Sequence, residues 1–259
     1  MNRPGYPLSS ENRHRLDDKV VLVTGAAGGI GRGVAKRCTL EGATVILLDK
    51  QEKQLNSTYD DIIALGQAEP VMVVDDLASL EPTRSELLAG QIDAAFGRLD
   101  GLLHFAADSV QLTPLVHTSL ERWQSVVNTN LNAAFELTRA LFPLLSGTTQ
   151  GTVVFSSGNA ARRRQAYYGA TGVSWGALDC LAETWTEETA DNEVVRFFSL
   201  DPGAVNTPMR TRIYPGEDPA NPCSVDDISD AYVHLLSTQD KDLPVRLSIR
   251  QGVLQADNC

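Results

Sequence analysis

The residues with the clearest chemical meaning form a glycine-rich turn, Thr24-Gly25-Ala26-Ala27-Gly28-Gly29-Ile30-Gly31, which follows a short apolar run. Gly25 can adopt a backbone angle closed to other residues, so the chain can reverse sharply there. Gly29 removes a side chain where the backbone would approach a pyrophosphate, and Gly31 lets a following helix pack closely on a sheet. The start of that helix presents free N–H groups and a positive dipole to phosphate. The turn therefore predicts a dinucleotide site at Thr24, Gly25, Gly29, Ile30 and Gly31.

A carboxylate, Asp49, stands at the end of the second apolar run, eighteen residues after Gly31. It can accept hydrogen bonds from the ribose hydroxyls on the adenine side of a dinucleotide. It would also repel a 2′-phosphate, which carries roughly −1.5 to −2 charges at neutral pH. The sequence therefore predicts NAD(H) in preference to NADP(H). Two alternatives stay open: Lys50 could pair with a 2′-phosphate, and Asp49 could instead cap the next helix.

The elements that must position these residues alternate along the chain. Apolar runs that read as solid strands are separated by amphipathic helical stretches, which predicts a parallel sheet covered on both faces. We expect one Rossmann-type doubly wound α/β domain with a seven-stranded, mainly parallel sheet and helices on both faces. The expected strands are residues 20–23, 44–48, 71–74, 101–105, 152–155, 194–200 and 245–249. The expected helices are about 30–40, one between strands two and three, 82–96, 120–145, 168–189 and 225–236.

One domain of residues 19–252 accounts for the whole pattern, with a polar N-terminal tail at 1–18 and a C-terminal tail at 253–259. The chain has 259 residues, a net charge of −11 and a sequence pI of about 4.8. This charge would repel nucleic acid, and no basic stripe is present to offset it. No apolar run approaches the roughly 20 residues that a membrane span needs. Four widely separated cysteines without a C-x-x-C pair suit a reducing compartment, so we expect a cytoplasmic protein without a metal site.

Four later segments, taken together with the turn, are typical of one enzyme family. They are Asn130-Leu131-Asn132-Ala133-Ala134-Phe135, Ser156-Ser157, Tyr168-Gly169-Ala170-Thr171 and Asp201-Pro202-Gly203-Ala204-Val205-Asn206-Thr207. With them the chain resembles the short-chain dehydrogenase/reductase family, in particular its YciK-type oxidoreductases, from about residue 19 to residue 252. The resemblance implies a nicotinamide cofactor and a small-molecule substrate with a carbonyl or alcohol group.

The resemblance also implies a role for each matching residue. Tyr168 matches the tyrosine that exchanges a proton with the substrate oxygen while hydride moves to or from the nicotinamide. Ser157 matches the serine that holds this oxygen, and Asn130 matches an asparagine of the proton relay. The implied cofactor contacts are Asp75 at the adenine amino group, Ala106 after the fourth strand, and Pro202, Gly203 and Thr207 at the nicotinamide end.

The chain departs from the family pattern at the position four residues after Tyr168. The family has a lysine there, one helical turn on, whereas this chain has Gly172, and no lysine occurs between Lys53 and Lys241. A cation about 4 Å from a tyrosine contributes on the order of 4 kcal/mol at an effective dielectric of about 20, or roughly three pKa units. Without it, we expect Tyr168 to be a poor base for alcohol oxidation. A neutral tyrosine can still donate a proton in carbonyl reduction.

Two explanations of the missing lysine stay open. An arginine from the run Arg162, Arg163 and Arg164 could supply the charge, although such a run also fits a solvated loop. Alternatively, the site has lost turnover and the protein is a cofactor-binding pseudoenzyme with a sensing or assembly role. The family's Asn-Ala-Gly after strand four is also replaced, by Phe105-Ala106-Ala107, and the spacing from Ser157 to Tyr168 is shorter than usual.

Several other features have simpler interpretations. Trp175 and Trp185 lie at helical spacing and suit either core packing or a subunit interface, and we expect a homodimer or homotetramer. The segment 209–224, rich in Pro, Gly and Glu, has the composition of a mobile substrate lid and does not reveal the substrate. The isolated histidines His104, His117 and His234 are expected to be packed or surface residues.

Overall fold

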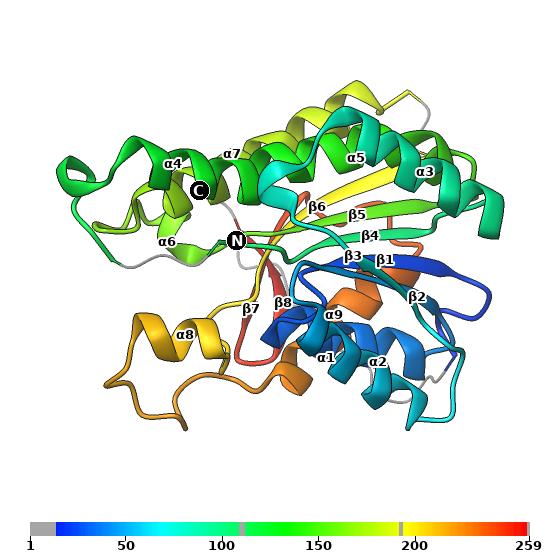
Figure 1. Cartoon of the computed structure of the whole chain (residues 1–259), viewed down its shortest axis with the longest axis horizontal. Coiled ribbons are helices and arrows are strands. Elements are labelled where there is room, and N and C mark those ends of the chain that lie inside the picture. The colour runs from blue at the N-terminus through cyan, green and yellow to red at the C-terminus, as the bar shows by residue number, and fades with distance from the viewer. Residues whose placement is uncertain (1–13, 109–111, 192–193, 258–259) are drawn as a thin grey trace.

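Eight strands form one sheet in the computed structural model, which describes residues 14–108, 112–191 and 194–257 (Figure 1). The strand order is β3-β2-β1-β4-β5-β6-β7-β8, and every neighbouring pair is parallel except β7 and β8. The strands are β1 (Val20–Thr24), β2 (Thr44–Asp49), β3 (Val71–Val74), β4 (Gly101–His104), β5 (Gly151–Ser156), β6 (Val195–Asp201), β7 (Arg246–Arg250) and β8 (Val253–Ala256). The predicted doubly wound, mainly parallel sheet is confirmed.

Helices cover both faces of the sheet (Figure 1). Along β1, Val21 and Val23 pack into the layer of α1, α2 and α9, whereas Val20 and Leu22 pack against α3, α5 and α7. This alternation explains why the strands read as solid apolar runs, since both faces of each strand are buried. The helices are α1 (Gly29–Leu40), α2 (Glu52–Ile63), α3 (Pro82–Phe96), α4 (Leu120–Val127), α5 (Ala133–Ser146), α6 (Asn159–Arg162), α7 (Gly169–Glu188), α8 (Pro208–Ile213) and α9 (Val225–Ser237).

The strand order reverses between β1 and β4, because β2 and β3 extend to one side of β1 and β4 to β8 extend to the other. In an open parallel sheet, the crossovers leave a crevice at the carboxyl ends of the strands where this reversal occurs. The turn after β1 and the segments after β4, β5 and β6 all open onto this edge. The topology alone therefore places the glycine-rich turn, Asn130, Ser157 and Tyr168 around one crevice.

The two ends of the domain differ from the predicted boundaries. Residues 253–256, expected to lie in a tail, form β8, an antiparallel strand paired with β7 through a two-residue turn at Gln251 and Gly252, both with positive φ (52° and 71°). The sheet therefore has eight strands rather than seven. A four-residue strand with a mixed pattern is too short for periodicity to detect. At the other end, Leu16 is fully buried in the core, so the domain begins before residue 19, and residues 1–13 of the expected tail lie outside the described residues.

Two helical predictions are refined by the structure. The expected helix of residues 120–145 consists of α4, a π-helical turn at Asn128–Asn132 and α5. The expected lid begins with the short helix α8, whose first residue is Pro208 and whose N-cap is Thr207. Within the described ranges, no helix is both long and apolar enough to cross a membrane.

Candidate active site

The turn after β1 is shaped so that side chains cannot replace its glycines. Gly25 has a φ of 66°, and a Cβ there would lie 2.7 Å from the backbone nitrogen of Ala106. A Cβ on Gly31 would lie 2.2 Å from the carbonyl oxygen of Gly25, and one on Gly29 would lie 2.7 Å from the Thr207 methyl carbon. The N-terminus of α1, at Gly29, Ile30 and Gly31, thus forms a cradle of backbone N–H groups next to a turn that carries no bulky side chains. This cradle fits a pyrophosphate.

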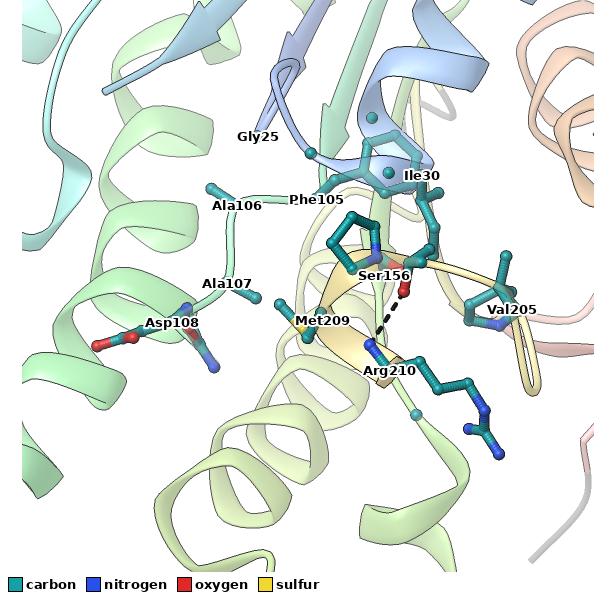
Figure 2. Close-up of a pocket in the computed structure, with 18 of the residues that line it drawn as sticks. Gly25, Ile30, Phe105, Ala106, Ala107, Asp108, Ser156, Val205, Met209 and Arg210 are labelled. Carbon is teal, nitrogen blue, oxygen red and sulfur yellow. Dashed lines mark hydrogen bonds between the residues drawn. The ribbon is translucent and has the colours of Figure 1, made fainter. Parts of the chain in front are cut away.

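Thr24 supports the cradle from below. Its side chain is fully buried, and its hydroxyl oxygen accepts hydrogen bonds from the N–H groups of Phe105 and Ala106, each at 3.2 Å. These bonds hold the carboxyl ends of β1 and β4 together at the point where the strand order reverses. Figure 2 shows Gly25, Ile30, Phe105 and Ala106 gathered around this part of the cleft.

The crevice is a cleft of about 1470 Å³, which exceeds the volume of most small-molecule pockets. It extends from the ends of β2 and β3, across β1 and β4, to the ends of β5 and β6 and the segment that contains α8. Its lining includes most of the expected site residues: Gly25, Gly29, Ile30, Gly31, Asp49, Asp75, Ala106, Asn130, Ser157, Tyr168, Pro202, Gly203 and Thr207.

Asp49 lines this cleft, but its carboxylate is also bound to the backbone. It is largely buried; its Oδ2 accepts the N–H of Ala27 at 3.1 Å, and its Oδ1 accepts the N–H of Gln51 at 2.9 Å. The carboxylate therefore anchors the glycine-rich turn to the end of β2, and the N-cap of α2 is Gln51 rather than Asp49. The next side chain, Lys50, lines the cleft with its ammonium exposed and 3.5 Å from the Asp76 carboxylate.

The carboxylates after β3 are both engaged by the protein. Asp75 forms an ion pair with Arg84, and its backbone N–H donates to the carbonyl of Asp49 at 3.1 Å. Asp76, which the sequence analysis did not single out, lines the cleft and accepts the N–H of Ala78 at 3.0 Å. The adenine contact assigned to Asp75 stays a prediction.

Asn130 is placed by the π-helical turn. The turn carries its amide side chain toward the cleft, where Oδ1 accepts the N–H of Asp108 at 2.7 Å and Nδ2 donates to Ser174 at 3.3 Å. π-Helical turns inside α-helices are frequent at functional sites. The amide thus ties the segment after β4 (Figure 2) to α7.

Ser157 follows β5 and is held by the backbone. Its N–H donates to the carbonyl of Leu200 at 2.9 Å, and its hydroxyl lies 3.4 Å from the carbonyl of Trp175 on α7. The side chain is 4% exposed and lines the cleft. Ser157 therefore joins the end of β5 to α7 beside Tyr168.

Tyr168 precedes α7, and its hydroxyl is hydrogen-bonded to the hydroxyl of Tyr214. Tyr214 follows α8, and its ring lies 4.8 Å from the guanidinium carbon of Arg210. Arg210 is paired with Glu217 through two hydrogen bonds, of 2.6 and 2.7 Å. Burial, followed by the hydrogen bond between Tyr168 and Tyr214, raises the pKa of Tyr168, and the Arg210 charge opposes this only in part. Tyr168 is therefore a neutral hydroxyl at pH 7.

The arginine run does not supply a cation to Tyr168. Arg162 is buried outside the cleft lining, and its guanidinium contacts the Asp179 carboxylate at 3.2 Å and the carbonyl of Leu247 at 2.8 Å. The expected solvated loop is wrong for Arg162, although Arg163 and Arg164 are exposed. Of the residues in α7, Trp175 and Leu178 line the cleft and Gly172 does not.

The last parts of the site are the segment after β6 and His104, the final residue of β4. Gly203 has a φ of 78°, and its N–H donates to Asp201. Thr207 accepts the N–H of Arg210 at 3.2 Å and so caps α8, as the dashed line in Figure 2 shows. His104 also lines the cleft, and burial lowers its pKa to about 3, so it is neutral at pH 7. Among the described side chains, no group of His, Cys, Asp and Glu is arranged to hold a metal ion.

Comparison with known proteins identifies the family. The short chain dehydrogenase model matches residues 19–218. The chain belongs to this family. It is 33% identical to the oxidoreductase YciK of Escherichia coli K12 over 226 residues, which cover 87% of this chain and 89% of YciK. Two solved structures, a short chain dehydrogenase of Shigella flexneri 2a complexed with NADP and one of Escherichia coli CFT073 complexed with NADPH, each align with a TM-score of 0.87 at 32% identity, over 92% of this chain and 98% of theirs. The protein is thus an oxidoreductase of the short-chain dehydrogenase type, dependent on NAD(P).

These structures correct the predicted cofactor preference. Two of the similar proteins are complexed with NADP or NADPH, so the expectation of NAD(H) over NADP(H) was wrong. The physical reason lies in the geometry of Asp49, whose two oxygens accept backbone N–H groups. The sequence shows a carboxylate at this position but not which hydrogen bonds it makes. The comparisons point to NADP(H) instead.

Proposed function

We propose that the cleft binds NADP(H). The glycine cradle fits the pyrophosphate, and Lys50 at the end of β2 provides a positive charge for a 2′-phosphate. The NADP and NADPH complexes of two similar structures support this assignment. We also propose that the adenine contacts Asp75 or its neighbour Asp76, which both line the cleft.

The reaction that the geometry supports best is reduction of a small-molecule carbonyl. A bound NADPH would supply a hydride to the carbonyl carbon, and Tyr168 would donate its hydroxyl proton to the oxygen. The products would be an alcohol, NADP⁺ and a tyrosinate, which would regain its proton from solvent. The observation that carries this proposal is the buried, neutral hydroxyl of Tyr168 in the cleft wall. A raised pKa keeps the Tyr168 hydroxyl protonated, as a proton donor must be, although it also makes this hydroxyl a weaker acid. It disfavours the reverse reaction, which needs a tyrosinate base. Ser157 would hold the substrate oxygen, and Asn130 would join the proton relay.

A second function is favoured by a specific observation, namely that α7 presents the indole of Trp175 to the cleft and no cation. Arg162, the buried member of the arginine run, is held by Asp179. The protein could then bind NADP(H) without turnover, as a sensor or assembly partner.

The experiment that separates the two functions follows NADPH oxidation with a panel of aldehydes and ketones. The wild-type protein is compared with Tyr168→Phe and with Tyr167→Phe, whose parent side chain is 58% exposed. General acid catalysis contributes about 100-fold or more, so Tyr168→Phe should lose that much while Tyr167→Phe keeps the wild-type rate. An unchanged rate in Tyr168→Phe would remove the role of Tyr168. Tight NADPH binding with no turnover of the panel would favour the second function.

We further propose a homodimer or homotetramer in the cytoplasm. The two tryptophans do not support an interface, since Trp175 faces the cleft and Trp185 stacks on Phe142 and Phe197 within the chain. Support comes instead from the exposed apolar side chains of Phe135 on α5 and Val173 on α7, which are 44% and 51% exposed. The free thiols of Cys38, Cys180 and Cys223 suit a reducing compartment.

A further inference from the structure

The cleft has an aromatic floor at the end of β5, formed by Trp175. Its indole packs directly on the backbone of Gly158, because a Cβ on Gly158 would lie 2.6 Å from both Cε3 and Cζ3 of the ring. The Ser157 hydroxyl lies 3.4 Å from the Trp175 carbonyl, and the Tyr168 ring is 6.1 Å away at a tilt of 42°. The absence of a side chain at Gly158 is thus what admits the indole. Trp175 is a fitted part of the cleft wall rather than a mobile surface side chain.

The order of the strands determines what reaches this floor. A dinucleotide with its pyrophosphate on the turn after β1 has one nucleoside on each side of β1. The side of β2 holds Lys50, which the proposed function assigns to the 2′-phosphate of the adenosine. The other nucleoside must then cross β4 toward β5, whose end lies about 10 Å from β1 at ordinary strand spacing. Trp175 stands at that end.

We propose that Trp175 contacts the nicotinamide half of the cofactor and holds it by an aromatic contact. Gly172, one turn earlier on α7, has no side chain that could do so. This inference rests on the proposed binding of NADP(H), but not on turnover. An indole offers a flat, polarisable surface to the nicotinamide and its ribose, and ring contacts of this kind change affinity by about two- to tenfold. Trp175 would therefore determine how firmly the reactive end of the cofactor is held.

The chain provides matched controls for a test by fluorescence. Besides Trp175, it contains Trp123 and Trp185, neither of which lines the cleft. Trp185 lies on the same helix, ten residues and about 15 Å further along. NADP⁺ does not absorb in the range of tryptophan emission, so its nicotinamide quenches an indole only on contact. A second ligand, 2′-phospho-ADP-ribose, has the adenine, the phosphates and no nicotinamide.

The experiment titrates both ligands into the wild-type protein, Trp175→Phe and Trp185→Phe, with thermal unfolding to confirm that each variant folds. We expect NADP⁺ to quench the wild-type protein and Trp185→Phe, and to leave the emission of Trp175→Phe unchanged although it binds. 2′-Phospho-ADP-ribose should bind all three without quenching. A second variant, Trp175→Ala, should bind NADP⁺ about tenfold more weakly and bind 2′-phospho-ADP-ribose with unchanged affinity.

Two outcomes would overturn the inference while leaving NADP(H) binding intact. One is equal quenching by NADP⁺ in the wild-type protein and Trp175→Phe. The other is equal quenching of the wild-type protein by the two ligands, since the contact would then come from the adenine half. Failure of both ligands to bind the wild-type protein would instead overturn the proposed function itself.

Discussion

Asp49 and Lys50 are adjacent in the chain, yet they face different partners. The Asp49 carboxylate is turned inward onto two backbone N–H groups, whereas the Lys50 ammonium stays exposed in the cleft. The two N–H bonds offset part of the carboxylate charge that would repel a 2′-phosphate, and they leave about two of its roughly four acceptor sites open. At the scale of single residues, the proposed cofactor preference rests on the exposed ammonium of Lys50, which lies 3.5 Å from the Asp76 carboxylate.

Reversing the charge of Lys50 should therefore weaken the binding of NADPH specifically. In Lys50→Glu, a carboxylate would face the 2′-phosphate, and we expect NADPH to bind at least about tenfold more weakly, or about 1.4 kcal/mol. Binding of NADH, which lacks this phosphate, should change little. Titration of cofactor fluorescence measures both. Lys53→Glu makes the same charge change at an exposed residue of α2 outside the cleft, and a loss of equal size there would contradict the role of Lys50.

At the scale of elements, the site depends on the start of α7 and on the segment that follows α8. Tyr168 lies just before α7, and its hydroxyl meets Tyr214 just after α8. Arg210 on α8 packs over the Tyr214 ring and is neutralised by Glu217. The segment from α8 to Glu217 therefore sets the environment of Tyr168, a role that local sequence patterns do not indicate.

Removing the Tyr214 hydroxyl should change the pH dependence of reduction. Burial and the hydrogen bond with Tyr214 raise the pKa of Tyr168, so its neutral, proton-donating form persists to high pH. In Tyr214→Phe the bond is lost, the pKa moves back toward its ordinary value, and the rate should begin to fall at a lower pH than in the wild-type protein. Rates of NADPH oxidation across the alkaline range test this. The control is Tyr59→Phe, since Tyr59 lies on α2 outside the cleft lining and its hydroxyl is bonded to Glu69. An alkaline limb that stays in place in Tyr214→Phe, or that moves equally in Tyr59→Phe, would disprove the link.

At the scale of the whole molecule, Arg162 joins parts of the chain that are distant in sequence. Its side chain is 5% exposed and contacts Asp179 on α7, the carbonyl of Leu247 on β7, and Asp257 after β8. The C-terminal hairpin is thus fastened to α6 and α7 behind the cleft. A buried charge pair of this kind makes the domain sensitive to the loss of either partner.

Arg162→Ala should destabilise the domain by about 3–5 kcal/mol, because it leaves the buried Asp179 carboxylate without its main partner. Arg163→Ala, at the exposed neighbour, should stay within about 0.5 kcal/mol of the wild-type protein. Urea unfolding measures the free energy of unfolding of each variant. Equal stability of the two variants would show that the Arg162 contacts contribute no net stability.

Much of this organisation could be predicted without coordinates. The glycine-rich turn, the alternation of strands and helices and the parallel sheet follow from local patterns, because backbone freedom at glycine and burial on both faces of a strand leave direct traces in composition. The family could also be recognised, since its motifs are short contiguous segments. The strand β8, the π-helical turn and the helix α8 left no such trace, as each is too short for its period to repeat.

The sequence by itself thus determined the fold class and the family, and it predicted where the cofactor binds. Only the tertiary structure decided how individual polar groups are used: Asp49 anchors a turn, Arg162 fastens the C-terminal hairpin, and Tyr168 is held neutral by burial and Tyr214. It also brought Trp175, rather than Gly172, to the cleft floor. The reason is that hydrogen bonding, burial and charge pairing depend on neighbours far away in the chain, and a residue's type and spacing do not name those neighbours.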